Sequence, residues 1–243
     1  MSAGPTRPPL KIVHLYPEQM NMYGDWGNVL AIRRRAEWFG YAPEVVAHHP
    51  GRPFPTGADI VIGGGGQDSG QHKVHADLMA IRDDLRSLAE VNAPMLMVCG
   101  LYQLFGHFFE TSEGDRLEGI GLFDAETHGG PERLIGNVVT DTPFGELIGY
   151  ENHSGLTILG AGQTALGRVI KGSGNNGQDR TEGAVYRSVY GTYLHGSLLP
   201  KNPRFADALL EAAALYRHGS FHSTPIDDQF AEQARLVAKK RPR

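Results

Sequence analysis

The chain has 243 residues, of which 40% are hydrophobic and 21% are charged, as is usual for a globular protein with a buried core. Its net charge of -4 does not provide the basic surface that nucleic-acid-binding domains usually carry. The single cysteine excludes an internal disulfide and a Cys-rich zinc site, and it suits a reducing compartment. We therefore expect a cytoplasmic protein without a nucleic-acid partner.

The two ends of the chain differ in composition from the middle. Residues 1–9 are rich in Pro and Gly and lack an apolar run, so we expect a flexible N-terminus and neither a signal peptide nor an anchor. Residues 10–218 form the predicted domain, without a stretch long enough to span a membrane. The polar residues 219–243 are predicted to be a flexible tail. Three apolar residues leave a weak amphipathic helix there as the alternative: Ile226, Phe230 and Val237.

Strands and helices alternate along the first half of the chain. Apolar runs predict strands at 11–16, 42–47, 59–62 and 95–98. Apolar residues at helical spacing predict helices at 25–39, 72–91 and 101–109. The run Met95–Val98 is continuously apolar, which is typical of a strand buried on both faces of a parallel sheet. This alternation predicts an α/β fold with a largely parallel central sheet.

The second half contains strands separated by Gly-rich loops. The predicted strands are 134–139, 165–170 and 186–194, and a helix is predicted at 203–216. Residues 172–177 match a dinucleotide-binding pattern, but the polar residues 178–183 that follow do not open an apolar helix. We therefore interpret this stretch as a loop.

Cys99 follows the apolar strand and precedes a helix. A residue on such a turn projects at the carboxyl edge of the sheet, where open α/β sheets place their sites, and it has the geometry of a nucleophile elbow. The amino end of a helix favours the reactive thiolate, and the N–H of Gly100 would face a developing oxyanion. The alternative is a small buried side chain without chemistry, because free cysteines are commonly buried.

Two further patterns fit this chemistry. Glycines 63–66 follow an earlier strand, and such a run lets backbone N–H groups of Gly64 and Gly65 approach a ligand. Taken alone, the run is also compatible with a plain turn. His195 ends a late strand, before Gly196. A histidine there can take the proton of a thiol and give it to departing ammonia, although a lone histidine is more often structural.

Together these patterns resemble class I glutamine amidotransferases of the cobyric-acid-synthase-like branch, which have a three-layer α/β fold. Residues 98–103 resemble its nucleophile motif, 192–196 its histidine motif, and 63–68 its oxyanion loop. Further stretches narrow the resemblance to the glutaminase subunits of lipid II isoglutaminyl synthases, the GatD family. These stretches are 22–28, 133–136, 149–153, 174–177 and 199–202.

The resemblance implies an activity and its residues. Cys99 would be the nucleophile, His195 the acid–base and Arg133 the group that binds glutamine, since a guanidinium can hold a carboxylate through two hydrogen bonds. Gln67 and Gln103 lie in the motif loops, and substrate contact and a plain polar role are equally open for both. No metal site is predicted.

The resemblance also implies a partner. Members of this family work with a Mur-ligase-like subunit, MurT, which binds ATP and Mg²⁺ and activates D-glutamate of the lipid II stem peptide. Ammonia released from L-glutamine then converts this residue to D-isoglutamine. We expect no cofactor in this chain, contact with lipid II only through the partner, and work at the inner membrane surface.

Two positions depart from the class I pattern. Met97 and Leu101 stand where many members have glycine, so the elbow does not follow the strictest form of the motif. Ser197 stands where the usual triad has glutamate, and a hydroxyl cannot stabilise an imidazolium as a carboxylate does. The enzyme would then be a Cys–His dyad or receive an acid from elsewhere, and our hypothesis is that the partner supplies it.

The sequence is also compatible with three other functions. The chain could serve a cobyric-acid-like acceptor, although that family carries an ATP-dependent synthetase domain in the same chain. It could be a stand-alone cysteine amidohydrolase, which would need no partner. It could also be a binding module that has kept an inactive glutaminase fold. The sequence does not decide the role of His153.

Overall fold

The computed structural model describes residues 7–241, so most of the stretch predicted to be a flexible N-terminus, residues 1–6, lies outside the described residues. Its centre is a six-stranded sheet in the order β11-β12-β4-β3-β1-β2, here called sheet A. Its strands are β1 (Pro9–Leu15), β2 (Ala42–His48), β3 (Ile60–Gly63), β4 (Met95–Val98), β11 (Ala184–Tyr186) and β12 (Val189–Thr192). All neighbours pair in parallel except β11 and β12, which are antiparallel. The predicted, largely parallel sheet is confirmed.

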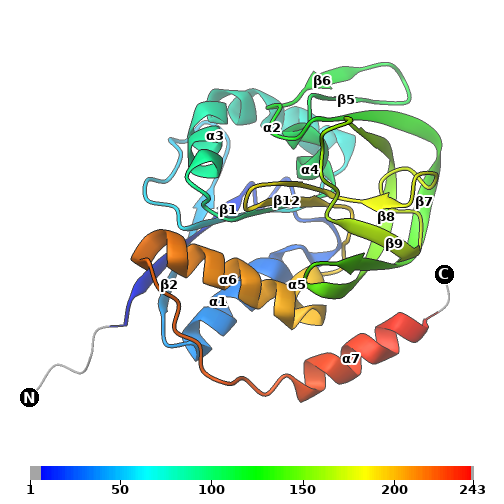
Figure 1. The fold of residues 1–243 in the computed structure, drawn as a ribbon. Coiled ribbons are helices and arrows are strands. Elements are labelled where there is room, and N and C mark those ends of the chain that lie inside the picture. Colours follow the sequence, from blue (N-terminus) through cyan, green and yellow to red (C-terminus); the bar gives the residue numbers. More distant parts are fainter. Residues whose placement is uncertain (1–6, 242–243) are drawn as a thin grey trace, which may run out of the picture.

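Helices cover both faces of sheet A, which gives the expected three layers (Figure 1). One face carries α1 (Trp26–Trp38) and α6 (Pro203–His218). The opposite face carries α2 (Asp68–Ala80), α3 (Arg82–Glu90) and α4 (Gly100–Phe105). All residues of β3 and β4 are buried between these layers, because apolar strands in a parallel sheet need cover on both faces.

A second sheet, sheet B, lies beside the first and is mainly antiparallel. Its strands are β5 (Phe108–Glu110), β6 (Arg116–Glu118), β7 (Ala125–Thr142), β8 (Gly145–Leu159), β9 (Gly167–Lys171) and β10 (Thr181–Glu182). The long hairpin of β7 and β8 dominates it. The two sheets meet where Tyr150 of β8 forms an isolated bridge with His195, just after β12.

Several predicted elements differ from those observed. The helix expected at 72–91 is two helices that meet at Ile81. The helix expected at 101–109 ends at Phe105, and residues 108–110 form β5 instead. Residues 172–177 form a loop, as expected.

The C-terminal part contains the amphipathic helix that was the alternative to a flexible tail, and this helix packs on the domain. Helix α7 (Gln229–Lys240) packs beside the β7–β8 hairpin and the short α5 (Leu198–Lys201) (Figure 1). The buried Arg35 of α1 pairs with Asp207 of α6 at 2.5 Å and with Asp228 at 2.6 Å. This double ion pair ties the start of α7 to the core, which local composition could not reveal. No helix among residues 7–241 is both long and apolar enough to cross a bilayer.

Candidate active site

Cys99 sits on a strained turn between β4 and α4. Its backbone has φ 50° and ψ -104°, a conformation that non-glycine residues rarely adopt and that clusters at functional sites. Its N–H donates to the carbonyl of Thr192 on the neighbouring strand at 2.8 Å. The elbow expected from the sequence is therefore present, and it is anchored to the strand that leads to His195.

The bulky neighbours of Cys99 are accommodated by a glycine on another strand. A Cβ on Gly63 would lie 2.2 Å from Leu101 Cδ1 and 3.0 Å from Met97 Sδ. The space that glycines flanking the cysteine would leave is thus supplied by β3, because Gly63 has no side chain. Met97 and Leu101 are therefore compatible with a sharp elbow.

His195 comes to the same corner from the end of β12. Its N–H donates to Tyr150 O at 2.8 Å, and its own carbonyl accepts from Tyr150 N at 3.3 Å. A Cβ on Gly65 would lie 2.4 Å from His195 Cε1 and 3.0 Å from Cys99 Cβ. The imidazole and the thiol therefore border the same point above Gly65, and the absence of a side chain there lets them meet.

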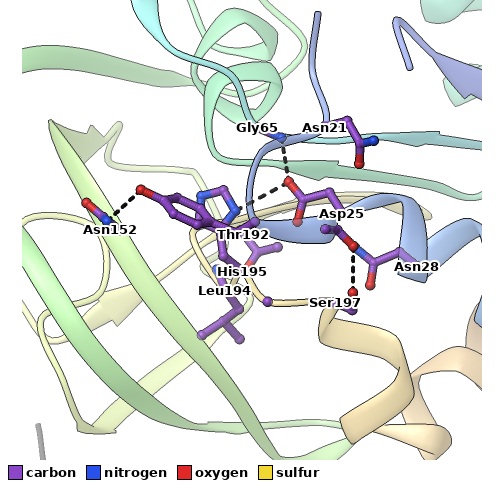
Figure 2. A network of polar contacts seen from close by, with 12 residues as sticks. Asn21, Asp25, Asn28, Gly65, Asn152, Thr192, Leu194, His195 and Ser197 are labelled. Carbon is purple, nitrogen blue, oxygen red and sulfur yellow. Dashed lines mark hydrogen bonds and ion pairs between the residues drawn. The ribbon is translucent and has the colours of Figure 1, made fainter. Parts of the chain in front are cut away.

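An acidic residue of the same chain stands beside the imidazole. Asp25 is buried, and its Oδ2 lies 3.3 Å from His195 Nδ1 (Figure 2). The contact is an ion pair rather than an aligned hydrogen bond, since His195 Nδ1 makes no hydrogen bond of good geometry within residues 7–241. Oδ2 also accepts the N–H of Gly65 at 2.7 Å. Asp25 is not among the site residues predicted from the sequence, from which we expect an acid of the partner instead. It lies inside the matching stretch 22–28, at the start of the helix predicted at 25–39, so the sequence does contain a signal for it.

These neighbours set the charge of His195. Burial alone would lower the pKa of this imidazole, but the negative charges of the Cys99 thiolate and the Asp25 carboxylate outweigh it and raise the pKa to about 10. At neutral pH the histidine is therefore protonated, beside the Cys99 sulfur and the Asp25 carboxylate. An imidazolium in this position can give its proton to a leaving group.

Ser197 does not contact the imidazole. Its Oγ donates to the carbonyl of Gly24 at 2.6 Å, so it holds the turn that leads to Asp25 (Figure 2). A Cβ on Gly27 would lie 2.2 Å from that Oγ, which explains the glycine at this position. The residue that replaces the usual glutamate thus helps to position a different carboxylate.

A pocket of about 600 Å³ opens over Cys99 and is bordered by both sheets. Arg133 lies in its wall, within the irregular part of β7 between Gly129 and Leu134. Its Nε donates to Asn152 Oδ1 at 2.9 Å and its Nη2 to Asn152 O at 3.0 Å. The structure therefore brings the predicted glutamine-binding residue to the same cavity as the predicted nucleophile.

The oxyanion donors need one correction. Gly65 N–H, predicted as a donor, is already bonded to Asp25. The next glycine, Gly66, lines the pocket together with Cys99. Its nitrogen lies 3.2 Å from where a Cβ on Gly100 would be. Gly66 is therefore the loop glycine whose N–H lies beside Gly100, while Gly64 packs against Met20 O and Asp25.

The two glutamines in the motif loops have different settings. Gln67 borders the pocket at the start of α2. Gln103 also borders it but is buried, and its amide accepts from Gln71 at 2.8 Å and donates to Tyr193 Oη at 3.1 Å. Gln103 therefore braces the floor of the pocket, whereas the exposed side chain of Gln67 makes no hydrogen bond to residues 7–241.

His153 also borders the pocket but is held as part of its wall. Its ring stacks on Tyr193 with centroids 3.6 Å apart, and Nδ1 donates to Gly155 O at 2.7 Å. Burial lowers the pKa of His153 to about 3, so the ring is neutral. It therefore offers no second proton donor beside His195.

Comparison with known proteins identifies the family of the chain. The family model for the CobB/CobQ-like glutamine amidotransferase domain matches residues 11–203. A lipid II isoglutaminyl synthase (glutamine-hydrolyzing) subunit GatD from Staphylococcus aureus is 38% identical over 94% of each chain. The subunit of the same name from Streptococcus pneumoniae is 34% identical over 92% of this chain and 88% of its own.

Solved structures agree on the fold. One glutamine amidotransferase superposes with a TM-score of 0.58 at 15% identity, covering 83% of this chain and 98% of its own. Another, from Thermotoga maritima, gives 0.50 at 16% identity, covering 95% and 93%. At such identities the likeness concerns architecture alone, while the family match covers most of the sequence. The chain therefore belongs to the family of CobB/CobQ-like glutamine amidotransferase domains and is a glutamine-hydrolysing amidotransferase.

Proposed function

We propose that this chain is the glutaminase subunit of a lipid II isoglutaminyl synthase. The observation that carries the proposal is the pocket that joins Cys99 to Arg133, in a chain alike over nearly its full length to two subunits of that name. The nucleophile and a cationic anchor for an amino-acid carboxylate then share one cavity, and the acid–base residue His195 is buried beside the nucleophile.

The first half of the reaction forms a thioester. Arg133 binds the α-carboxylate of L-glutamine, and the Cys99 thiolate attacks the side-chain amide carbon. The N–H groups of Gly66 and Gly100 hold the oxyanion, and each such donor contributes roughly 3 kcal/mol to lowering the barrier in comparable acyl transfers. His195 gives its proton to the amide nitrogen, the C–N bond breaks, and ammonia leaves.

The second half releases glutamate. His195, now neutral, takes a proton from water as the oxygen attacks the thioester carbon. The C–S bond breaks and restores the thiolate, and His195 is again an imidazolium beside Asp25. The carboxylate of Asp25 stabilises this charge in both halves.

The ammonia serves a carboxylate activated elsewhere. We propose a Mur-ligase-like partner, MurT, which binds ATP and Mg²⁺ and activates the D-glutamate of lipid II at the cytoplasmic membrane surface. This chain would meet lipid II only through that partner and needs no cofactor of its own for the thioester chemistry.

The direct test uses the complex of this chain with such a partner. Glutamate release and D-isoglutamine formation are followed with L-glutamine, ATP, Mg²⁺ and lipid II. We expect both products together, and amidation to stop when ATP is withheld.

The matched control is the same complex carrying Cys99→Ser. This variant should fail with glutamine but amidate lipid II when ammonium chloride is added, because external ammonia bypasses the thioester. A wild-type complex that hydrolyses glutamine but leaves lipid II unchanged while amidating a corrinoid carboxylate would contradict the proposed acceptor. Full turnover without any partner would instead favour a stand-alone amidohydrolase.

A further inference from the structure

Tyr23 lies in the turn between Met22 and Asp25, and nothing in the mechanism above uses it. Its backbone is left-handed, with φ 56° and ψ 23°, which is unfavourable for a bulky residue and persists only where surrounding contacts hold it. The turn is fixed on either side. Met22 N–H donates to Gly65 O at 2.9 Å, and the carbonyl of Gly24 accepts from Ser197 at 2.6 Å.

The side chain of Tyr23 lies between His195 on one side and the Asn152–Arg133 pair on the other. The ring meets the ring of His195 edge-on, with centroids 5.2 Å apart and planes at 78°. The phenol oxygen accepts the Nδ2–H of Asn152 at 2.6 Å (Figure 2). Asn152 in turn accepts from Arg133 through its side-chain oxygen and its carbonyl.

We propose that Tyr23 is a positioning residue that sets Arg133 through Asn152 and shields His195 with its ring. The inference rests on the glutamine hydrolysis proposed above. It assigns to one side chain the link between the group that binds the substrate carboxylate and the group that carries the proton.

The hydroxyl acts on substrate binding. Arg133 is exposed, and its Nε and Nη2 are aligned by a single residue, Asn152. The amide of Asn152 presents its oxygen to the guanidinium only while its NH₂ group points the other way, and Tyr23 Oη accepts that NH₂ group. Loss of the phenol oxygen lets the amide rotate, so Arg133 is held less firmly for a carboxylate.

The ring acts on the imidazole. His195 is fully buried, whereas Tyr23, whose ring contacts it, lines the pocket and is 44% exposed. The aromatic edge is therefore part of what keeps water of the pocket from His195 and Cys99. Water at that point would weaken the electrostatic interactions of the imidazolium.

Two substitutions separate these roles. Tyr23→Phe keeps the ring and removes the oxygen, so KM for glutamine should rise about 3- to 10-fold, as for the loss of one hydrogen bond, with kcat within about twofold. Tyr23→Gly suits the left-handed backbone and leaves the turn unstrained, so loss of the ring should lower kcat about 10-fold. The phenylalanine variant therefore rescues kcat but not KM.

A double substitution tests the route through Asn152. In an Asn152→Ala background, Tyr23→Phe should leave KM unchanged, because the link is already broken. Tyr216→Phe, on an exposed tyrosine at the far end of α6, is the control and should match wild type. Equal KM values for wild type and Tyr23→Phe, or a further rise in the Asn152→Ala background, would overturn the inference. These experiments measure glutamate release, which does not depend on the acceptor. A failure to amidate lipid II would therefore refute the proposed acceptor without affecting the test of Tyr23.

Discussion

Three side chains from distant parts of the sequence form the catalytic site: Cys99, His195 and Asp25. Cys99 and His195 were predicted from local pattern, because a residue after a buried strand and a residue at the end of a strand are recognisable in sequence. Asp25 was not, since its contact with His195 spans most of the chain. The glutamate missing at Ser197 pointed to an acid from elsewhere. The structure finds one in the same chain, so the partner is not needed to provide a carboxylate.

Asp25→Asn tests this carboxylate. The amide keeps an oxygen that can accept the N–H of Gly65, but the negative charge is lost, so the pKa of His195 should fall below its present value of about 10. The alkaline limb of the pH profile of kcat/KM should move to lower pH, because the imidazolium is lost earlier. We expect kcat to fall roughly 10²-fold. An unchanged profile would show that Asp25 does not support the imidazole.

The same pKa shift affects stability. The pKa of His195 is raised on folding, so its contribution is fully present below the unfolded value of 6.5 and is lost as pH rises through about 10. The free energy of unfolding of the wild type should therefore decline over this range more steeply than that of Asp25→Asn. Urea unfolding at neutral and alkaline pH measures the difference.

Gly65→Ala tests the close approach of the two catalytic side chains. The added Cβ would lie 2.4 Å from His195 Cε1, so the imidazole must move away from the thiol. A displacement of this size should cost about 10²-fold in kcat, with little loss of secondary structure by circular dichroism. Activity within about twofold of wild type would mean that the ring can shift without cost, and the proposed geometry would be wrong.

At the scale of elements, the parallel sheet was predictable and sheet B was not. Strands such as β3 and β4 are short apolar runs and can be recognised from the sequence alone. The hairpin of β7 and β8 contains exposed and half-buried residues over most of its length, so only its part at 134–139 gave a strand signal. The role of the hairpin depends on contacts between distant residues, because β8 bonds to the backbone of His195 through Tyr150 and aligns Arg133 through Asn152.

Helix α7 was predicted only as the less favoured alternative, because its fixing contacts come from other elements. Arg35→Met should remove the pairs with Asp207 and Asp228 and leave two aspartates facing each other. Both are about one-third exposed or less, so we expect a loss of about 2 kcal/mol, below the ~3–5 kcal/mol of fully buried pairs.

Urea unfolding measures this change. Arg34→Met is the matched control, because Arg34 is on the same helix with 63% of its side chain exposed, and it should cost under about 0.5 kcal/mol. An Arg35→Met variant as stable as this control would show that the ion pairs do not fasten the C-terminal helix.

In the whole molecule, one sheet carries the catalytic residues and the other carries the residues proposed to bind the substrate. Sheet A presents the nucleophile and the acid–base at the carboxyl ends of β4 and β12. Sheet B supplies Arg133 and Asn152, so the pocket exists only where the sheets meet. This arrangement explains why motifs spread from Met22 to Asn202 resemble one family: each contributes to a single cavity or to the turns that frame it.

Covalent labelling tests whether Cys99 is the nucleophile of a glutamine-specific site. The complex is incubated with a diazoketone analogue of L-glutamine, and the adduct is located by peptide mass spectrometry. We expect one adduct per chain, on Cys99, prevented by excess L-glutamine but not D-glutamine, and much slowed by Arg133→Ala. Adducts at another residue, or labelling of Cys99 that glutamine does not slow, would show that Cys99 is not this nucleophile.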